Sequence, residues 1–409
     1  MKALIALGVA VVAAVAAAAP AVSASTDQRG KVVNVVDGDT VDVDIAGDGT
    51  SRPVTIRNAG LQTMELGQCH ADDAAAVMRQ VALGKTVRVT AQSSGSTSLG
   101  RPVRTVDVIG SSGTVDTQLE VLRRGQALPF PMGFEQSRST AYLLAAEKAA
   151  VAGTGLWDDD ACGAGPSVGA PLRVMVMYEG DGDESRNPNA EWVDIRNEGS
   201  TDVPIAGWWL RSAAQDSFFF PAGSVVRAGG TTRVYVGKGT QTATSFHWGF
   251  SAPRFNNLSP TRRVGGGAYL FDPQGDLRAH SSYPCLYGSC LTPVARGKVR
   301  LQARYDAPGD DAKNVNGEYL TITSLVTKPV NLAWVVVEVN GNTLQLQPGT
   351  VLPKKGSTVR IHMGKGTTTA TTKYWGHTGS MLTNSGGSVE LRTAESSRIA
   401  CASWGTGHC

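Results

Sequence analysis

The stretch Val35-Val36-Asp37-Gly38-Asp39-Thr40-Val41 places two carboxylates and a hydroxyl at a tight turn between runs of β-branched residues. Successive side chains of a strand point to opposite faces, so such a turn holds its polar groups at one defined edge. Asp-Gly alone is a common hairpin turn. The motif is more informative together with three later residues, because Arg57, Glu65 and Arg101 follow it in that order. An acid, arginine, acid, arginine series indicates a site that hydrolyses a phosphodiester.

The first residues have the pattern of an export signal. Lys2 precedes an uninterrupted apolar run from Ala3 to Ala19, and small residues continue up to Ala24. This pattern predicts a signal peptide over residues 1–24. No later segment is long and apolar enough to cross a bilayer. We therefore expect a secreted, extracellular protein with no membrane span in the mature chain.

The six cysteines fit an oxidising compartment. Six thiols allow fifteen connectivities, and the sequence does not choose among them. Proximity favours Cys285 with Cys290 and Cys401 with Cys409, which leaves Cys69 for Cys162. A metal site is disfavoured because no C-x-x-C spacing occurs. We expect three disulfides.

Charge is distributed unevenly along the chain, although the formal net charge is only +3. Residues 25–163 hold 13 Lys/Arg and 17 Asp/Glu, whereas residues 291–409 hold 13 and 7. The C-terminal third is therefore basic, which predicts an anionic polymer or a cell-surface component as its partner. Solubility alone would explain the same imbalance. Several of the basic side chains within one stretch of the tail are expected to share a face: Lys354, Lys355, Arg360, Lys365 and Lys373.

An internal repeat covers the C-terminal two-thirds of the chain. Residues 189–195 recur as 316–322, and residues 233–240 recur as 360–367, with a constant offset of 127 residues. A constant offset without a gap predicts two copies of one domain. Short alternating strands between Gly, Pro, Asn and Asp turns predict a β-sandwich in each copy. In the first copy the expected strands are Trp192 to Asn197, Gly207 to Leu210, Phe218 to Phe220, Thr231 to Val236 and Ala268 to Phe271.

Four motifs of the repeat carry a family resemblance: Asn-x-Glu-Trp-Val-x-Ile-x-Asn from Asn189, Gly-Trp-Trp-Leu from Gly207, Phe-Pro-Ala-Gly from Phe220 and Val-x-Val-Gly-x-Gly from Val234. On these motifs the repeat resembles lamin tail domains of the bacterial secreted type. The resemblance covers residues 172–290 well and residues 298–409 more loosely, with residues 164–171 as a linker. It implies two immunoglobulin-like sandwiches with an attachment or binding role. Of the pair Trp208-Trp209, one indole is expected in the core and the other half exposed.

The N-terminal part alternates strands with amphipathic segments. Apolar residues at helical spacing from Asp72 to Leu83 predict a helix that ends at Gly84. Two more helices are expected over Val115 to Arg124 and Phe134 to Val151. Five strands with these helices predict an OB-fold barrel, so the whole chain is expected to be mainly β. The strands of the barrel are Lys31 to Val36, Thr40 to Ile45, Pro53 to Arg57, Thr86 to Ala91 and Val103 to Ile109.

Ordered motifs give residues 29–163 a second resemblance: Val36 to Thr40, Arg57 through Glu65, Leu99-Gly100-Arg101, Leu122 to Ala127 and Gly155-Leu156-Trp157. On these motifs the segment resembles the staphylococcal-nuclease-like (thermonuclease) family. The resemblance implies that Arg57 and Arg101 hold the phosphate and that Glu65 activates the attacking water. It also implies a Ca²⁺ ion bound by Asp39, by the backbone oxygen of Thr63 and by the residue at position 62.

Position 62 departs from the family pattern, because Gln62 stands where the family has a second calcium carboxylate. An amide oxygen can bind Ca²⁺, but the lost charge predicts weak binding. This departure leaves two hypotheses. The first is a secreted calcium-dependent nuclease that cleaves DNA or RNA, with the sandwiches serving attachment or substrate binding. The second is a non-catalytic extracellular protein with a degenerate nuclease fold that binds nucleic acid or a cell surface.

Overall fold

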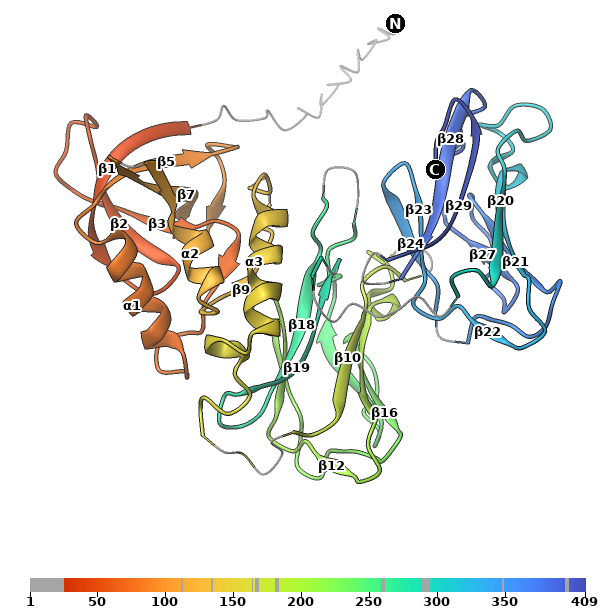
Figure 1. Cartoon of the computed structure of the whole chain (residues 1–409), viewed down its shortest axis with the longest axis horizontal. Coiled ribbons are helices and arrows are strands. Elements are labelled where there is room, and N and C mark those ends of the chain that lie inside the picture. Colours follow the sequence, from red (N-terminus) through yellow and green to blue (C-terminus); the bar gives the residue numbers. More distant parts are fainter. Residues whose placement is uncertain are drawn as a thin grey trace, which may run out of the picture.

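The computed structural model describes residues 26–111, 113–133, 135–163, 165, 169–180, 184–258, 262–284, 286–287, 295–347, 349–393 and 397–409. The predicted signal peptide, part of the expected linker and the predicted Cys285–Cys290 disulfide lie outside these residues. As predicted, the fold is mainly β (Figure 1). Within the described part of the chain, no helix has the length and apolar character to span a membrane.

Five strands of the N-terminal part close into a barrel. They pair in the order β3-β2-β1-β5-β7, and a parallel pairing of β3 with β7 closes the ring. Alternate residues fill its interior, because strand side chains alternate between faces; Val32, Val43 and Val87 are fully buried. The assignment of this barrel to the OB-fold stays a prediction. The strands are β1 Thr26–Val35, β2 Thr40–Ile45, β3 Val54–Asn58, β5 Thr86–Ala91 and β7 Arg101–Gly110.

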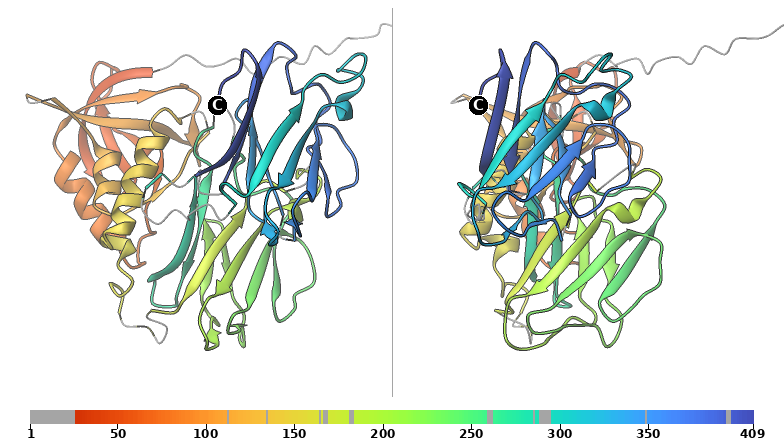
Figure 2. Two further views of the ribbon diagram at one scale, coloured as in Figure 1. Left: turned by 45° about the vertical axis from the view of Figure 1, so that its right-hand side comes forward. Right: turned by 90° about the vertical axis from the view of Figure 1, so that its right-hand side faces the viewer.

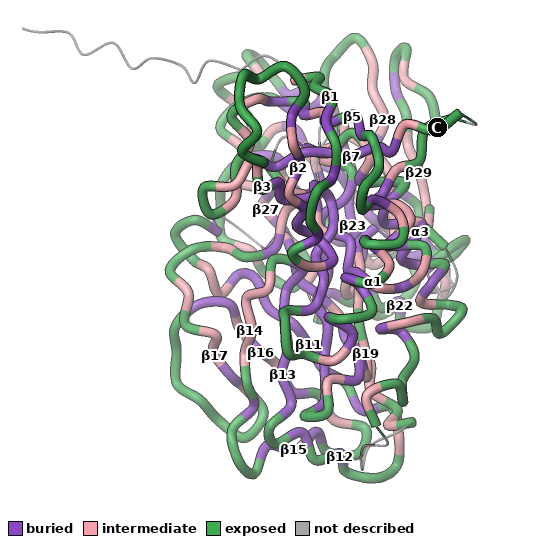
Figure 3. The backbone as a smooth tube through the Cα atoms, turned by 90° about the vertical axis from the view of Figure 1, so that its left-hand side faces the viewer, coloured by how far each residue is buried: buried purple, intermediate pink, exposed green. Residues whose placement is uncertain are grey.

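Three helices accompany the barrel (Figures 1 and 3): α1 Ala71–Ala82, α2 Thr117–Arg123 and α3 Ser139–Val151. Helix α1 agrees with its expected bounds within a residue. The expected start of α2 at Val115 is wrong, because Val115 and Asp116 end strand β8 (Gly113–Asp116) and the Asp116 carboxylate caps the helix at Leu119 N. The start of α3 also comes later than expected. The preceding Arg138 is held in a turn by ion pairs to Asp107 and Asp116.

Short elements complete the barrel and its connection to the next domain: β4 Leu61–Gln62, β6 Thr97–Ser98, β9 Leu128–Pro129 and the 3-10 helix η1 Gly155–Trp157. Strands β4 and β9 pair with each other, and β6 and β8 pair with β7.

The two C-terminal units are β-sandwiches with the same strand order. In the first, the sheets are β10-β11-β16-β17, β12-β15 and β14-β13-β18-β19. In the second, they are β20-β21-β26-β27, β22-β25 and β24-β23-β28-β29. Each sandwich has its own buried apolar core. The offset of 127 residues thus relates whole strands, as from β11 to β21.

The first sandwich consists of β10 Leu172–Met177, β11 Trp192–Asn197, β12 Val203–Pro204, β13 Trp209–Ser212, β14 Ser217–Phe219, β15 Val225–Val226, β16 Thr231–Gly237, β17 Ser245–Phe250, β18 Gly266–Phe271 and β19 Leu277–Tyr283, with the 3-10 helix η2 Pro188–Ala190. The second consists of β20 Val299–Arg304, β21 Tyr319–Ser324, β22 Val330–Asn331, β23 Val336–Val339, β24 Asn342–Gln345, β25 Val351–Leu352, β26 Thr358–His362, β27 Thr372–Tyr374, β28 Gly386–Arg392 and β29 Arg398–Gly405, with η3 Val315–Gly317.

The barrel and the first sandwich share one continuous apolar core, and α3 lies between them beside β18 and β19 (Figures 1 and 2). Trp209 belongs to this shared core and stacks on Phe271 with ring centroids 4.3 Å apart. The expectation of a half-exposed indole is therefore wrong, since Trp208 and Trp209 are both buried. Trp208 faces the sandwich core and Trp209 faces the barrel. The contact fixes the first sandwich against the candidate site.

Candidate functional site

The turn between β1 and β2 carries two carboxylates, those of Asp37 and Asp39. Gly38 is required there, because a Cβ at this position would lie 2.5 Å from the Ala74 Cβ of α1. Asp39 N donates to Asp37 Oδ1 at 2.9 Å, which fixes the turn. Burial, followed by the charge of Asp39, raises the pKa of Asp37 to about 6. The close approach of helix α1 thus places Asp39 inside the protein.

Asp39 is buried at the centre of a polar network. Its Oδ2 accepts hydrogen bonds from Gln62 Nε2 at 3.1 Å, Thr63 N at 3.2 Å and Thr63 Oγ1 at 3.2 Å. Arg57 Nη2 forms an ion pair with the same oxygen at 3.2 Å. The other oxygen, Oδ1, accepts from Thr40 Oγ1 at 3.0 Å. Both carboxylate oxygens therefore already have protein donors.

Gln62 links Arg57 to Asp39. Its Oε1 accepts from Arg57 Nη2 at 2.6 Å, while its Nε2 donates to Asp39. The reversed amide would place its NH₂ against a guanidinium and its oxygen against a carboxylate, so the two partners determine the orientation. Arg57 also donates to Asn58 O at 2.5 Å and Leu61 O at 2.8 Å. Burial is the main cause that lowers the pKa of Arg57, against the opposing charge of Asp39.

This donor set does not fit Ca²⁺, which requires six to eight oxygen ligands directed at the ion. The Gln62 oxygen faces Arg57, and the Thr63 backbone oxygen accepts from Gln62 Nε2 at 3.4 Å. Asp39 alone contributes a carboxylate, and Arg57 neutralises it. In this arrangement the residues therefore offer no site for calcium-assisted chemistry.

Glu65 and Arg101 lie at the edge of the same network. Arg101 Nη1 donates to Thr40 Oγ1 at 3.2 Å, which connects it to Asp39. Glu65 is exposed, and its Oε1 accepts a hydrogen bond from Gln215 Nε2 of the first sandwich. The six residues expected to form the site therefore lie around one region of the barrel surface, with Arg57, Asp39, Gln62 and Thr63 buried beneath Glu65 and Arg101.

A cleft of about 1050 Å³ opens above this region, between the barrel and the first sandwich. The barrel contributes Asp39, Glu65 and Arg101, and the sandwich contributes Gln215, Arg254 and others. Three further carboxylates line its wall, those of Asp37, Glu135 and Asp216, and each has a protein partner; Asp37 accepts from Asp39 N. Glu135 accepts from Gln92 N, Ser93 N and Ser96 Oγ, and Asp216 lies 3.8 Å from Arg254 Nε.

The contribution of the first sandwich to this cleft was not predicted from the sequence. Arg211, next to the cleft-lining Ser212, does not line the cleft itself; it is 2% exposed, and its Nη1 donates to Met64 Sδ at 3.5 Å. Burial lowers the pKa of Arg211 to about 10. Gln215 stands in the β13–β14 hairpin with a φ of 74°, a left-handed conformation that is uncommon for residues other than glycine. No motif marks either residue, because each contacts a barrel residue that is far away in the sequence. Arg211 contacts Met64, and Gln215 contacts Glu65.

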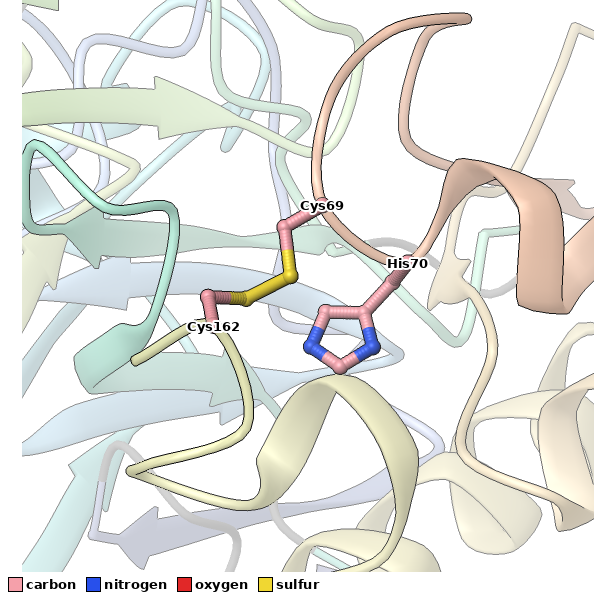
Figure 4. A group of neighbouring side chains, drawn as sticks. All are labelled: Cys69, His70 and Cys162. Atoms are coloured by element: carbon pink, nitrogen blue, oxygen red, sulfur yellow. A yellow bond between two sulfur atoms is a disulfide. The ribbon is translucent and has the colours of Figure 1, made fainter. Parts of the chain in front are cut away.

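A separate cluster lies at the junction of the barrel and the first sandwich and consists of Cys69, His70 and Cys162 (Figure 4). Their ligand atoms lie within 4.8 Å of one another, but the two cysteines form a disulfide, as expected from the sequence. Sulfurs joined in this way are not thiolate ligands, so the group is not a metal centre. The predicted disulfide between Cys401 and Cys409 is also present.

The strand order of the first sandwich and the motifs on its strands can be compared with known families. Residues 172–285 match the family model of the Lamin Tail Domain. The first sandwich is thus a lamin tail domain, as the motifs from Asn189 to Val234 predicted. The comparison detects neither a thermonuclease domain in the barrel nor a second lamin tail domain, although the second sandwich has the same topology. No curated protein matches the chain.

Proposed function

We propose that this protein binds nucleic acid in the cleft between the barrel and the lamin tail domain without hydrolysing it. The observation that carries the proposal is the closed network of Arg57, Gln62 and Asp39. Hydrolysis assisted by a metal needs carboxylate oxygens that face the ion and a base placed to activate water. Here the oxygens of Asp39 accept protein donors, and Glu65 accepts a hydrogen bond from Gln215.

Arginines of the cleft supply attraction for phosphate. Arg101 bonds to the neutral hydroxyl of Thr40, so that bond leaves its charge uncompensated. Arg254 faces Asp216 at 3.8 Å, but this pair lies at the half-exposed rim, where ion pairs contribute little. Guanidinium groups match phosphate oxygens in a bidentate geometry. The volume of the cleft suits a few nucleotides better than a single ion.

Calcium-dependent cleavage of nucleic acid is the second candidate function. It is favoured by one observation, which is that Glu65 and Arg101 line the same cleft as Asp39. This function requires Gln62 to turn from Arg57 and Glu65 to leave Gln215. It also includes the expectation that Gln62→Asp increases calcium affinity, which a calcium titration of activity for both forms would measure.

One experiment separates the two functions. The secreted protein is titrated with a fluorescent single-stranded oligonucleotide, in EDTA and in calcium, and the same samples are run on a denaturing gel. We expect equal binding in both buffers and intact oligonucleotide. Arg101→Ala should weaken binding about tenfold, the order of one lost charge-assisted contact. The control is Arg88→Ala, an exposed barrel arginine paired with Asp27, which should bind normally. Calcium-dependent cleavage that Glu65→Gln abolishes would establish the nuclease instead.

A further inference from the structure

The second sandwich turns the outer face of one sheet to solvent. In sheet β20-β21-β26-β27, Leu320, Ile322 and Ile361 point into the core and are fully buried. Because side chains alternate, their neighbours point outward. Figure 1 places this sheet at the end of the molecule opposite to the barrel. The outward residues, all described, include no Asp or Glu: Arg300, Gln302, Arg304, Tyr319, Thr321, Thr323, Thr358, Arg360, His362, Thr372 and Tyr374.

Arg304, Tyr319, His362 and Tyr374 form one row across the four strands, since they are direct neighbours in register. The Tyr319 and His362 rings lie 5.4 Å apart, and the His362 and Tyr374 rings lie 5.2 Å apart. His362 Nδ1 is hydrogen-bonded to Asn316 O at 2.7 Å, which fixes the middle of the row. The aromatic side chains therefore form a rigid support on the open face.

Two arginines rest on this support. The Arg360 guanidinium lies 4.4 Å from the Tyr319 ring centroid, and that of Arg304 lies 5.6 Å from it. Arg304 Nη1 also donates to the Tyr319 phenol oxygen at 3.3 Å. Cation–π contacts hold the charges in place without neutralising them. A pre-ordered charge loses less side-chain entropy when it binds an anion.

The equivalent row of the lamin tail domain is neutralised at Arg233 and covered at Trp192. Arg233, which corresponds to Arg360, forms a bidentate ion pair with Asp194 at 2.6 and 2.8 Å. Trp192, which corresponds to Tyr319, is 5% exposed and contacts Trp334 of the second sandwich, with ring centroids 6.4 Å apart. The second sandwich has Thr321 in place of Asp194.

We infer that the outer face of sheet β20-β21-β26-β27, with Arg300, Arg304 and Arg360 as its cations, binds the phosphate backbone of nucleic acid. Charge complementarity selects a polyanion, because the face presents three arginines and no carboxylate. Arg300 and Arg304 are four residues apart on β20, about 13 Å from each other, so one ligand must carry repeated charges to reach both. This surface is separate from the cleft and does not depend on its function.

The sequence suggested that several basic side chains of the tail share one face. The structure instead places them on different sides of the second sandwich. Of the five cations in this stretch of the tail, Arg360 lies on the outer face of the sheet. Lys373 is buried on the opposite side of β27, and Lys354 and Lys355 lie in the turn before β26. Lys365 lies in the loop after β26. The proposal of an anionic partner is therefore supported by arginines of the strands rather than by the lysines of this stretch.

Thr321→Asp in the full chain tests the inference, because it introduces the counter-ion that Asp194 provides in the lamin tail domain. The matched control is Thr406→Asp, which adds the same charge at an exposed position after β29, on the other sheet. Binding of a fluorescent oligonucleotide of about 20 thymidines is measured by anisotropy at several salt concentrations. We expect Thr321→Asp to weaken binding about tenfold and Thr406→Asp to weaken it less than twofold.

Salt dependence and a second variant complete the test. Three phosphate contacts on a single strand predict a slope of log K against log salt of about −2, which Thr321→Asp should reduce by about 0.7. Tyr319→Leu keeps the charges but removes their support, and should weaken binding about threefold. Equal effects of Thr321→Asp and Thr406→Asp would overturn the assignment of this face. Tighter binding of a sulfated polysaccharide than of the oligonucleotide, lost in Thr321→Asp, would overturn the choice of ligand. If Arg101→Ala weakens binding and Thr321→Asp does not, the cleft binds the oligonucleotide and the inference about the outer face of sheet β20-β21-β26-β27 is overturned.

Discussion

Where the lamin tail domain carries Asp194 beside Arg233, the second sandwich carries Thr321 beside Arg360, in the same register of the same strands. The stacked pair Tyr235–His247 recurs as His362–Tyr374 with the two residue types exchanged. Centroid distances of 5.1 and 5.2 Å show that the packing is the same. The outer faces of the two copies thus share a scaffold and differ in charge and in cover.

The interiors of the two copies differ much less than these faces. Glu191 and Glu318 are both fully buried 127 residues apart, and each accepts backbone hydrogen bonds from a loop before the β18 or β28 strand. A buried carboxylate that satisfies several N–H groups is costly to replace. The comparison therefore separates residues required by the fold from residues that distinguish the two surfaces.

The largest expected effect is the loss of either buried glutamate. Glu191→Ala and Glu318→Ala each leave backbone donors of a buried loop without an acceptor, and should lower the free energy of unfolding by about 3 kcal/mol or more. Chemical denaturation of the full chain measures both. Glu198→Ala is the control, because Glu198 is exposed directly after β11 and takes part only in a surface ion pair with Arg173 at 3.8 Å. A variant that loses less than about 1 kcal/mol would show that the two copies do not share this interior requirement.

Removal of the aromatic residue at the equivalent surface positions should separate the copies. Trp192→Ala opens a cavity under Trp334 and should cost about 3 kcal/mol, as large-to-small changes in cores do. Tyr319→Ala acts on an open face and should cost less than about 1 kcal/mol. Thermal unfolding of both variants gives the two values. Equal costs would mean that the outer face of the second sandwich is also covered.

Glu179 gives a pH-dependent test at the joint between the copies. Burial is the main cause that raises its pKa to about 8, and its Oε2 accepts from Thr343 Oγ1 of the second sandwich. The folded state then holds a proton that the unfolded state releases above its ordinary pKa of 4.5. Stability from this group is therefore complete below about pH 4.5 and is lost as the pH rises towards 8.

Glu179→Gln should consequently unfold at the parental temperature at pH 4.5 and be more stable than the parent at pH 6, by about 2 kcal/mol. Asp306→Asn is the matched control, since Asp306 is the counterpart in the second copy and is exposed. It should show no such difference. A parental pH dependence in Glu179→Gln would mean that Glu179 does not hold a proton in the folded state.

Features carried by neighbouring residues were predictable from the sequence, and contacts across long separations were not. The apolar spacing from Asp72 to Leu83 predicted α1, and the constant offset predicted two sandwiches of one strand order. Glu65 and Gln215 are 150 residues apart, so no motif indicated that the lamin tail domain reaches the candidate site. Trp209 is buried for the same reason, because its cover comes from the barrel.

The smallest expected effect, and the one that decides what distinguishes the two faces, is that of Asp194→Thr. The substitution gives the lamin tail domain the residue of the second sandwich, and removes an ion pair whose arginine is 26% exposed. Partly exposed ion pairs are worth little, so stability should fall by about 1 kcal/mol. Arg233 would be released from its counter-ion but would remain stacked on Trp192, 4.5 Å from its ring, beneath the contact with Trp334.

We therefore expect the oligonucleotide affinity of Asp194→Thr to stay within twofold of the parent. Trp334 still covers Trp192 after Arg233 has lost its counter-ion. Anisotropy titration at low salt measures this, with Thr321→Asp in parallel as the reciprocal exchange. A clear gain in affinity would mean that the missing carboxylate alone makes a binding surface. In that case the contact between Trp192 and Trp334 would have no part in the difference between the copies. An unchanged affinity, together with a loss in Thr321→Asp, would assign the difference to charge and cover acting together.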